Sequence, residues 1–393
     1  MRILLITPTL PYPLDTGGRI VVFNTIKILA KRHQIFLLSL IQEGQQKYVP
    51  FLKDYCISIE TVLKDISFSK KGLLLNLFSL TPYNMTRYQT WEMEEKLKEI
   101  VSKNQFDLVQ IEHLHMAQYA KFVGRIPVIL RQHNVESVMM ERYYKYATNI
   151  LERIYAYFQW RKLVRYERKM CLKSNLVITL SKVDEGYIKR LSLHINTEVV
   201  SCGVDFEYFK PPSLEREMDK IIYIGGLSFQ PVFEGIYYFL KKTWPKIKNS
   251  CPEVKFYILG KYPGDKYKKI KDIPDVVFLG YVQDVRPHMA TSTLTVVPHR
   301  IASGVRLKIL ESMTMGLPIV STSIGCEGIS VLNGEHILIA DSPELFAQKV
   351  ITLLKDGNLR RNLAEKAYTL VQNKYTWENV EKKLDEIYSR FIN

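Results

Sequence analysis

The stretch that decides the fold is residues 298–322, which read PHRIASGVRLKILESMTMGLPIVST. An apolar, β-branched run ends just before it, and a loop containing Gly304 follows. A helix is predicted to begin near Val305 or Arg306 and to stop at Gly316, before the next β-branched run. Strand, loop, helix and strand in this order are typical of a parallel sheet whose strands are joined by crossover helices.

Three charged residues of this stretch point to an anionic ligand. Arg306 and Lys308 fall in the first turn of the predicted helix, where the helix dipole disfavours cations unless an anion is present. A bound diphosphate would remove that conflict. Glu311 lies further along the helix and could accept two hydrogen bonds from vicinal hydroxyls such as those of a ribose. The plain alternative is a solvated charged helix face, but the order of glycine loop, basic turn, glutamate, glycine and proline argues against it.

The alternation of strands and helices extends along the whole chain. In the first half, strands are predicted at Ile3–Thr7, Ile35–Ser39, Leu108–Ile111, Val128–Leu130, Leu176–Thr179 and Glu198–Ser201. In the second half they are predicted at Ile221–Ile224, Lys255–Leu259, Val276–Leu279, Leu294–Val297, Ile319–Ser321 and Ile337–Ile339. Because 393 residues with 47% apolar content exceed what one core normally organises, we expect two α/β domains.

The boundary between the domains is predicted near Phe206–Glu215, a segment without strand or helix periodicity that contains a proline pair. The domains are therefore placed at 1–205 and 206–375. The C-terminal residues 376–393 form a separate predicted helix, because apolar residues recur there at helical spacing. A solvated helix would not need such a stripe, which is made by Trp377, Val380, Leu384, Ile387 and Phe391.

The loop after the first predicted strand contains Gly17 and Gly18 at the start of a predicted helix. Paired glycines at a helix start let backbone N–H groups approach a phosphate closely. A plain turn is an equally good interpretation of this short signal. The pattern is not GxGxxG, which disfavours a dinucleotide cofactor.

Charge and cysteine usage narrow the class of protein. The net charge of +15 favours a polyanionic partner, whether nucleic acid, an acidic membrane face or a phosphorylated small molecule. Five scattered cysteines without a CxxC pair indicate a reducing compartment. The apolar start ends too early for a signal peptide, and no apolar run reaches the roughly 18 residues of a membrane span. We therefore expect a cytoplasmic protein, with the inner membrane face as a candidate peripheral contact.

A long basic segment at Tyr143–Ser174 mixes arginines and lysines with aromatic and aliphatic residues and is predicted as one helix. Such a helix can lie on anionic lipid, although one solvated face on a long helix is the slightly favoured interpretation. The apolar run Leu73–Leu80 after Lys70 and Lys71 adds some weight to membrane contact. No nucleic-acid fold signature accompanies the charge, so we predict no nucleic-acid partner.

A group of polar residues follows two neighbouring strands in the first domain. Glu112, His113 and His115 end one strand, and His133 follows the next. An isolated histidine after a strand is more often packed than catalytic. His113 and His115 alternate as metal ligands can, but no nearby acid-and-histidine set completes a site, and we predict no metal.

The blocks together resemble the family 4 retaining glycosyltransferases of the GT-B fold. Residues 303–311 look like that family's donor signature, in the subgroup that reads GxRxKxLE. Further blocks agree in order along almost the whole chain: Pro11–Arg19, Gln132–Asn134, Leu176–Ser181, Cys202–Asp205, Ile224–Leu227, Tyr257–Gly260 and Val277–Val282. Each block alone is unspecific, but the combination is specific.

The resemblance assigns roles residue by residue. It implies that Glu311 holds the ribose, that Arg306 and Lys308 neutralise the diphosphate, and that His133 faces the transferred sugar. Donor contacts are further implied at Gly17, Gly18, Gly226, Val282, Ser303, Gly304, Val305 and Leu307. Two departures stand out. Ser303 replaces a glutamate that contacts a sugar hydroxyl, and the segment after Gly226 lacks the family's diphosphate-gripping Arg and Lys.

The fold that the resemblance implies is two Rossmann-like domains facing across a cleft, with the C-terminal helix 376–393 packing back on the N-terminal domain. The implied activity is transfer of a sugar, with retention, from a nucleotide sugar to a saccharide or lipid-linked acceptor in cell-surface polysaccharide or glycoconjugate synthesis. No cofactor is expected beyond the nucleotide-sugar substrate. The alternative is a non-catalytic nucleotide-sugar or glycan-binding protein of the same fold.

Overall fold

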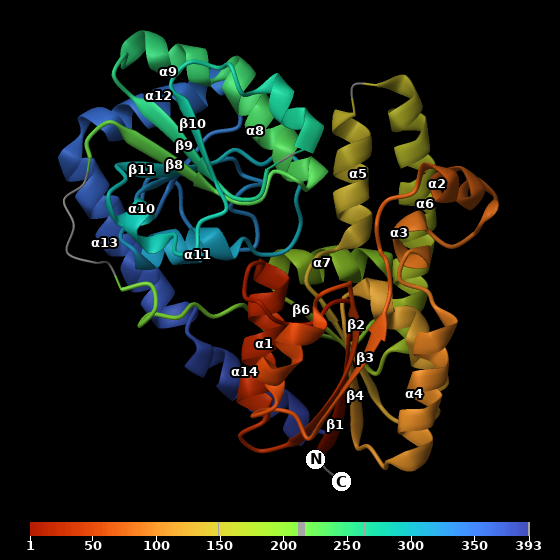
Figure 1. The fold of residues 1–393 in the computed structure, drawn as a ribbon. Coiled ribbons are helices and arrows are strands. Elements are labelled where there is room, and N and C mark those ends of the chain that lie inside the picture. The colour runs from red at the N-terminus through yellow and green to blue at the C-terminus, as the bar shows by residue number, and fades with distance from the viewer. Residues whose placement is uncertain (148, 211–216, 263, 392–393) are drawn as a thin grey trace. The chain divides into compact units, whose positions relative to one another are not determined.

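The structure is a computed structural model that describes residues 1–147, 149–210, 217–262 and 264–391. The chain divides into two compact units, which we call unit 1 (Met1–Cys202 with Glu378–Asn393) and unit 2 (Gly203–Trp377) (Figure 1). The predicted linker Phe206–Glu215 falls in the first part of unit 2, and its residues from 211 onward lie outside the described residues.

The described part of unit 1 is built on a seven-stranded parallel sheet in the order β3-β2-β1-β4-β5-β6-β7. The strands are β1 (Arg2–Thr7), β2 (Gln34–Ile41), β3 (Ser58–Leu63), β4 (Leu108–Glu112), β5 (Val128–Gln132), β6 (Leu176–Thr179) and β7 (Thr197–Val199). The inner strands are buried on both faces, which explains their nearly continuous apolar sequences.

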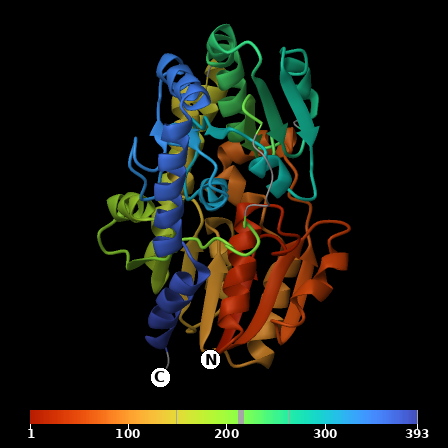
Figure 2. The same ribbon diagram turned by 90° about the vertical axis from the view of Figure 1, so that its left-hand side faces the viewer.

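Helices cover both faces of this sheet. They are α1 (Gly17–Leu29), α2 (Lys70–Leu75), α3 (Tyr83–Thr86), α4 (Trp91–Lys103), α5 (Glu136–Tyr146), α6 (Ile150–Lys173), α7 (Lys182–Leu191) and α14 (Trp377–Ser389), with 3-10 turns η1 (Gln46–Leu52), η2 (Asn76–Phe78) and η3 (Leu114–Phe122). Figures 1 and 2 show α1 and α14 on one side of the sheet, and Figure 1 shows α4 on the other. A core beneath α4 packs Met93, Leu97 and Ile100 against strand residues such as Leu4.

The C-terminal helix α14 returns to unit 1, as predicted from the resemblance. Its buried stripe is Val380, Leu384, Ile387 and Tyr388. Two ion pairs of 2.6 Å, Lys31 with Glu381 and Arg32 with Asp385, join it to the chain just after α1. The apolar residues that recur at helical spacing in the sequence thus form the side of α14 that is buried in unit 1.

Unit 2 has a six-stranded parallel sheet among its described residues, in the order β10-β9-β8-β11-β12-β13. Its strands are β8 (Lys220–Ile224), β9 (Lys255–Leu259), β10 (Val276–Gly280), β11 (Leu294–Val297), β12 (Ile319–Ser321) and β13 (Leu338–Ile339). The helices are α8 (Gln230–Lys242), α9 (Trp244–Ser250), α10 (Arg286–Ala290), α11 (Leu307–Thr314), α12 (Pro343–Lys355) and α13 (Gly357–Lys374), with the 3-10 turn η4 (Gly264–Lys269). Trp244, Phe239 and Phe256 form the aromatic centre of its core.

The predicted strands overlap observed ones in both units, and the α/β fold of two parallel sheets is confirmed. One strand, β3, was not predicted. It lies at the sheet edge and half of its six residues, Ser58, Glu60 and Thr61, are polar, so it lacks the apolar run of the buried strands.

Two helix predictions were wrong in detail. Residues 143–174 do not form one helix: α5 ends at Tyr146, and Asn149 caps the start of α6 through its side chain. An Asn side chain that accepts backbone N–H bonds favours a new helix start over continuation. The other helix, α11, begins at Leu307, because Gly304 is left-handed with φ 75° and Arg306 is extended.

Candidate active site

Each sheet has a point where the strand order reverses, and loops that leave the carboxyl ends of the strands there form ligand-binding crevices in open α/β sheets. In unit 2 this point lies between β8 and β11. The loop after β8 contains Gly226, and the loop after β11 contains Ser303 and Gly304. The sequence-predicted donor residues therefore come from the two loops where a ligand is expected.

Lys308 is the cation at the centre of this region. Its Nζ donates to the hydroxyl of Tyr223 over 3.0 Å, and that hydroxyl lies 3.0 Å from Nε2 of His299. Burial lowers the pKa of Lys308 to about 8, although the Glu311 carboxylate opposes the shift. A side chain at Gly225 would collide with Nζ of Lys308. The loop after β8 therefore brings backbone close to the lysine.

Glu311 lies one turn beyond Lys308 on α11 and is partly buried. Burial raises its pKa to about 7, and the charge of Lys308 limits the rise. Burial, together with the nearby carboxylates of Asp284 and Glu311, raises the pKa of Tyr208, whose ring packs under Arg286 at 4.1 Å. Tyr208 thus packs on the segment after β10.

Arg306 differs from its predicted setting. It is the residue before α11 and not part of the first turn, and its side chain is buried. Nε donates to the carbonyl of Gly325 over 2.7 Å, and Nη2 donates to that of Glu327. Arg306 therefore holds the segment after β12 in place as well as carrying charge beside Lys308.

The remaining predicted donor residues surround the start of α11. Ser303, Gly304 and Leu307 are buried, while Val305 is half-buried. Val282 follows β10, two strands away from β8, and is half-buried. The residues near α11 are close in sequence, whereas Val282 comes from the segment after β10.

The equivalent reversal point in unit 1 lies between β1 and β4. Helix α1 begins there at Gly17, its preceding residue Thr16 makes no side-chain cap bond, and its first turn has no acidic residue. A Cβ at Gly18 would lie 3.4 Å from Nε2 of His113. The two glycines thus let the start of α1 approach the histidines that follow β4.

His133 and Glu112 form a buried pair at the carboxyl ends of β4 and β5. Nε2 of His133 lies 2.6 Å from Oε2 of Glu112, and Gln110 donates to the other carboxylate oxygen. Burial alone would raise the pKa of Glu112, but the bond to His133 and nearby positive charge, including that of Arg131, keep it below its usual value. The carboxylate is therefore ionised and can orient the imidazole.

His113 stacks on His133, with ring centroids 3.9 Å apart and 18° between the planes. Burial and the neighbouring charges of His133, His115 and Arg131 lower the pKa of His113 well below its ordinary value, so this imidazole is neutral. Within the described ranges, no three His, Cys, Asp or Glu side chains are grouped as ligands for a metal ion.

Known proteins show the same architecture over the whole chain. The Anabaena protein HepE, solved in complex with UDP and glucose, aligns with a TM-score of 0.73 at 15% identity over 99% of each chain. Residues 16–208 match the protein-family model described as Glycosyltransferase Family 4, and residues 219–356 match the one described as Glycosyl transferases group 1. The chain is a GT-B glycosyltransferase.

Two curated relatives of this glycosyltransferase match different shares of its chain. An uncharacterized 44.6 kDa protein in the cps region of Klebsiella pneumoniae is 22% identical, over 96% of this chain and 97% of its own length. The capsular polysaccharide biosynthesis glycosyltransferase CapM of Staphylococcus aureus is 22% identical, over 49% of this chain and 54% of its own.

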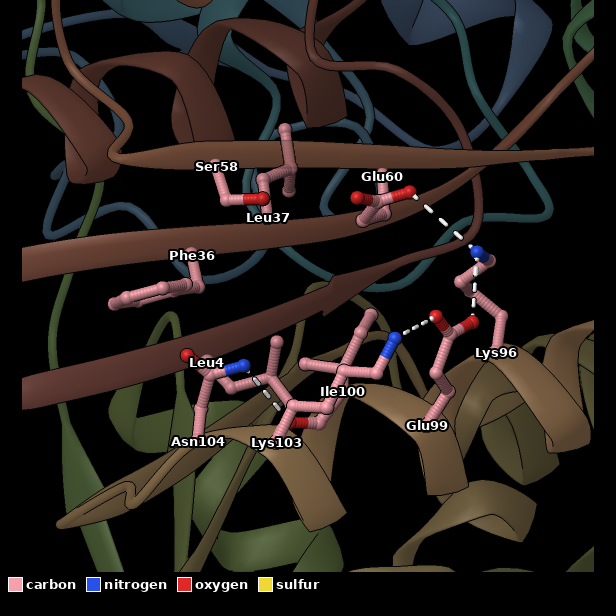
Figure 3. A pocket seen from close by; sticks show the side chains of 10 residues that line it. All are labelled: Leu4, Phe36, Leu37, Ser58, Glu60, Lys96, Glu99, Ile100, Lys103 and Asn104. Carbon is pink, nitrogen blue, oxygen red and sulfur yellow. Dashed lines mark hydrogen bonds and ion pairs between the residues drawn. The ribbon is translucent and has the colours of Figure 1, made fainter.

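A pocket in unit 1 of the glycosyltransferase lies away from these groups. It has a volume of about 210 Å³ and lies between α4 and the strands β1, β2 and β3 (Figure 3). Its charged groups pair with each other, Glu99 with Lys103 at 2.7 Å and with Lys96 at 2.9 Å. Asn104, the residue that follows α4, also lines the pocket. We assign no substrate to it.

Sequence reasoning did not single out Tyr223, His299 and Tyr208 as site residues. Tyr223 and His299 look like ordinary strand and loop residues, and only the bond from Lys308 to Tyr223 and that between Tyr223 and His299 reveal them. Glu112 was noticed beside the histidines, but its partner was not. The position of Glu112 at the end of a buried strand could have indicated the pair, because a buried carboxylate needs a hydrogen-bonding partner.

Proposed function

We propose that this glycosyltransferase moves a hexose from a nucleoside-diphosphate sugar to a saccharide or lipid-linked acceptor, with retention of anomeric configuration, in cell-surface polysaccharide or glycoconjugate synthesis. The donor class is supported by HepE, whose structure contains UDP and glucose. The pathway is supported by the cps-region relative and by CapM. Retention rests on the resemblance of residues 303–311 to the retaining family.

The observation that carries the proposal is Lys308, a largely buried lysine with a pKa lowered to about 8. A buried cation next to a glycine loop at the strand-order reversal is stabilised when an anion binds beside it. The start of α11 offers backbone N–H groups to the same anion. We assign the donor diphosphate to this place and the ribose hydroxyls to Glu311.

We propose that the two cations near the start of α11 promote departure of the diphosphate. As the sugar leaves, negative charge grows on the diphosphate oxygen, and fixed cations at Lys308 and Arg306 stabilise that charge more in the transition state than before it. These side chains take the part that a divalent ion has in other transferases, so we propose a metal-independent reaction. Transfer that persists in EDTA supports this, and transfer restored only by added divalent ions contradicts it.

On unit 1, we propose that His133 contacts the transferred sugar and that Glu112 positions its imidazole. Gly17 and Gly18 open the start of α1 beside His113, where phosphate or sugar oxygens can meet backbone N–H groups. Contact with the inner membrane face is part of the proposal where the acceptor is lipid-linked.

A thermal-shift screen against nucleoside diphosphates and nucleotide sugars tests the donor assignment. A ligand at about 100 times its Kd stabilises the folded protein by about 2.7 kcal/mol, which is a measurable shift. Proton NMR of the product then reports the anomeric configuration. Binding without transfer or donor hydrolysis would support the alternative of a non-catalytic nucleotide-sugar or glycan-binding protein, which Ser303 in place of the usual glutamate keeps open.

A further inference from the structure

Two apolar segments of unit 1 lie side by side on its surface. One is α2 with η2 and the residues that follow, and the other is the first half of α6; Figure 1 shows α2 beside α6. Hydrogen bonds that are buried or partly buried join the two segments. Gln159 on α6 donates to the side chain of Asn76 over 3.0 Å, and Lys162 donates to its carbonyl over 2.7 Å. The relative position of these two segments is therefore fixed.

Large apolar side chains project from both segments into solvent. Phe78 is 92% exposed, Leu80 is 89% exposed and Leu151 is 74% exposed. Leu75, Ile154 and Phe158 are exposed as well, and we call these six side chains on the two neighbouring segments the apolar face. Single exposed apolar residues need no explanation, but several of them on two segments that hydrogen bonds hold side by side indicate an interaction surface.

Basic residues continue the same side of α6. Arg161, Arg165 and Arg168 follow Phe158 at spacings of three and four residues, which places them along one helical stripe. All three are exposed, and none forms an ion pair within the described residues. Lys162 is used differently, since it binds the carbonyls of Asn76 and Leu77. The arginine stripe is thus available to an outside anion.

We propose that the apolar face and the arginine stripe dock this glycosyltransferase on a lipid bilayer that contains anionic lipids. Apolar side chains enter the acyl boundary while guanidinium groups stay among anionic headgroups. A second copy of the chain would bring two arginine stripes of a +15 protein together, which like-charge repulsion disfavours. A polynucleotide would bind the arginines but would leave Phe78 and Leu80 in water. None of the described helices is both long enough and apolar enough to span the bilayer, so the contact is peripheral.

Sedimentation of the full chain with vesicles tests the proposal. Vesicles of phosphatidylcholine with 30% phosphatidylglycerol, roughly the charge of an anionic membrane surface, are compared with phosphatidylcholine alone. We expect the wild type to partition at least about tenfold better onto the anionic vesicles. Phe78→Ser with Leu80→Ser lowers that partition about tenfold or more, and Arg161→Gln with Arg165→Gln removes most of the dependence on phosphatidylglycerol.

Matched control variants separate docking from general surface change. Leu193→Ser alters a residue that is 82% exposed elsewhere on unit 1, and Lys242→Gln with Lys366→Gln removes two exposed charges from unit 2. We expect both controls to bind vesicles as the wild type does. Because the substituted side chains are exposed, thermal midpoints should not change, and transfer to a water-soluble acceptor should persist.

Two results would overturn the proposal. One is equal vesicle binding by the wild type and both docking variants. The other is a wild-type dimer at micromolar concentration that Phe78→Ser with Leu80→Ser turns into a monomer, since the face would then be a self-association surface. The vesicle assay needs no donor, so its outcome is independent of the proposed transfer reaction.

Discussion

His133 and Glu112 meet at 2.6 Å between Nε2 and Oε2, and both side chains are buried. They come from adjacent strands, since Glu112 ends β4 and His133 directly follows β5. An ionised carboxylate in this position fixes both the orientation and the protonated nitrogen of the imidazole. Glu112 is therefore assigned as a positioning residue for His133.

Glu112→Gln tests this relationship. Losing a hydrogen bond to a charged group lowers kcat about 10- to 100-fold, while donor affinity, which we have proposed to depend on unit 2, stays near the wild-type value. Steady-state kinetics with separate measurement of donor Kd provides the readout. Glu112→Asp keeps the charge and should recover part of kcat. Equal losses in kcat and thermal stability for both variants would mean that Glu112 is only structural.

Lys308→Met separates donor binding from stability. Removing a charge-assisted bond to phosphate weakens nucleoside-diphosphate binding about 100-fold. The thermal midpoint without donor should not fall, because a buried cation is costly and methionine retains most of the length of the side chain. Calorimetric titration and a melting curve measure the two effects. Normal donor binding by the Lys308→Met variant would disprove the diphosphate assignment.

Arg306→Ala is expected to behave differently, because Arg306 also bonds the carbonyls of Gly325 and Glu327. Leaving buried carbonyls without donors costs about 1–3 kcal/mol of unfolding free energy. We predict lower activity and a lower thermal midpoint together. The comparison with Lys308→Met is the control, since only the arginine variant should melt earlier.

The pKa values of Glu311 and Lys308 predict a narrow pH range for donor binding. In the proposed donor site Glu311 accepts ribose hydroxyls best as a carboxylate, so affinity is expected to fall as pH drops below about 7. Lys308 loses its proton as pH rises through about 8, so affinity falls again above that value. Donor Kd measured from about pH 6 to 9 should therefore be lowest between these limits. In the Glu311→Gln variant the loss of affinity below about pH 7 should disappear. If that loss persists, another group causes it.

The free energy of unfolding without donor should depend on pH through the same two groups, and the two dependences have opposite signs. Glu311 has a folded pKa of about 7, above its ordinary 4.5, so the free energy of unfolding falls as pH rises between these values. Lys308 has a folded pKa of about 8, below its ordinary 10.5, so the free energy of unfolding rises again over that interval. Denaturant titrations at a series of pH values measure both slopes.

Much of the fold could be predicted because its signals are local. Apolar runs marked the buried strands, and the spacing of Val380, Leu384 and Ile387 marked α14. Edge strand β3 and the break before Asn149 were missed, because a half-polar strand and a single capping side chain are weak signals next to a long helical pattern. The start of α11 was placed slightly too early for a similar reason, since backbone angles at Gly304 and Arg306 decide it.

By itself the sequence determined the order of strands and helices, the glycine loops and the presence of Arg306, Lys308 and Glu311 in one short segment. The tertiary structure decided what those residues touch. Tyr223 and Lys308 are 85 residues apart and Glu112 and His133 are 21 apart, yet both pairs are within hydrogen-bond distance. Backbone preferences act over a few residues, whereas burial and pairing of charged groups depend on which strands the sheet brings together.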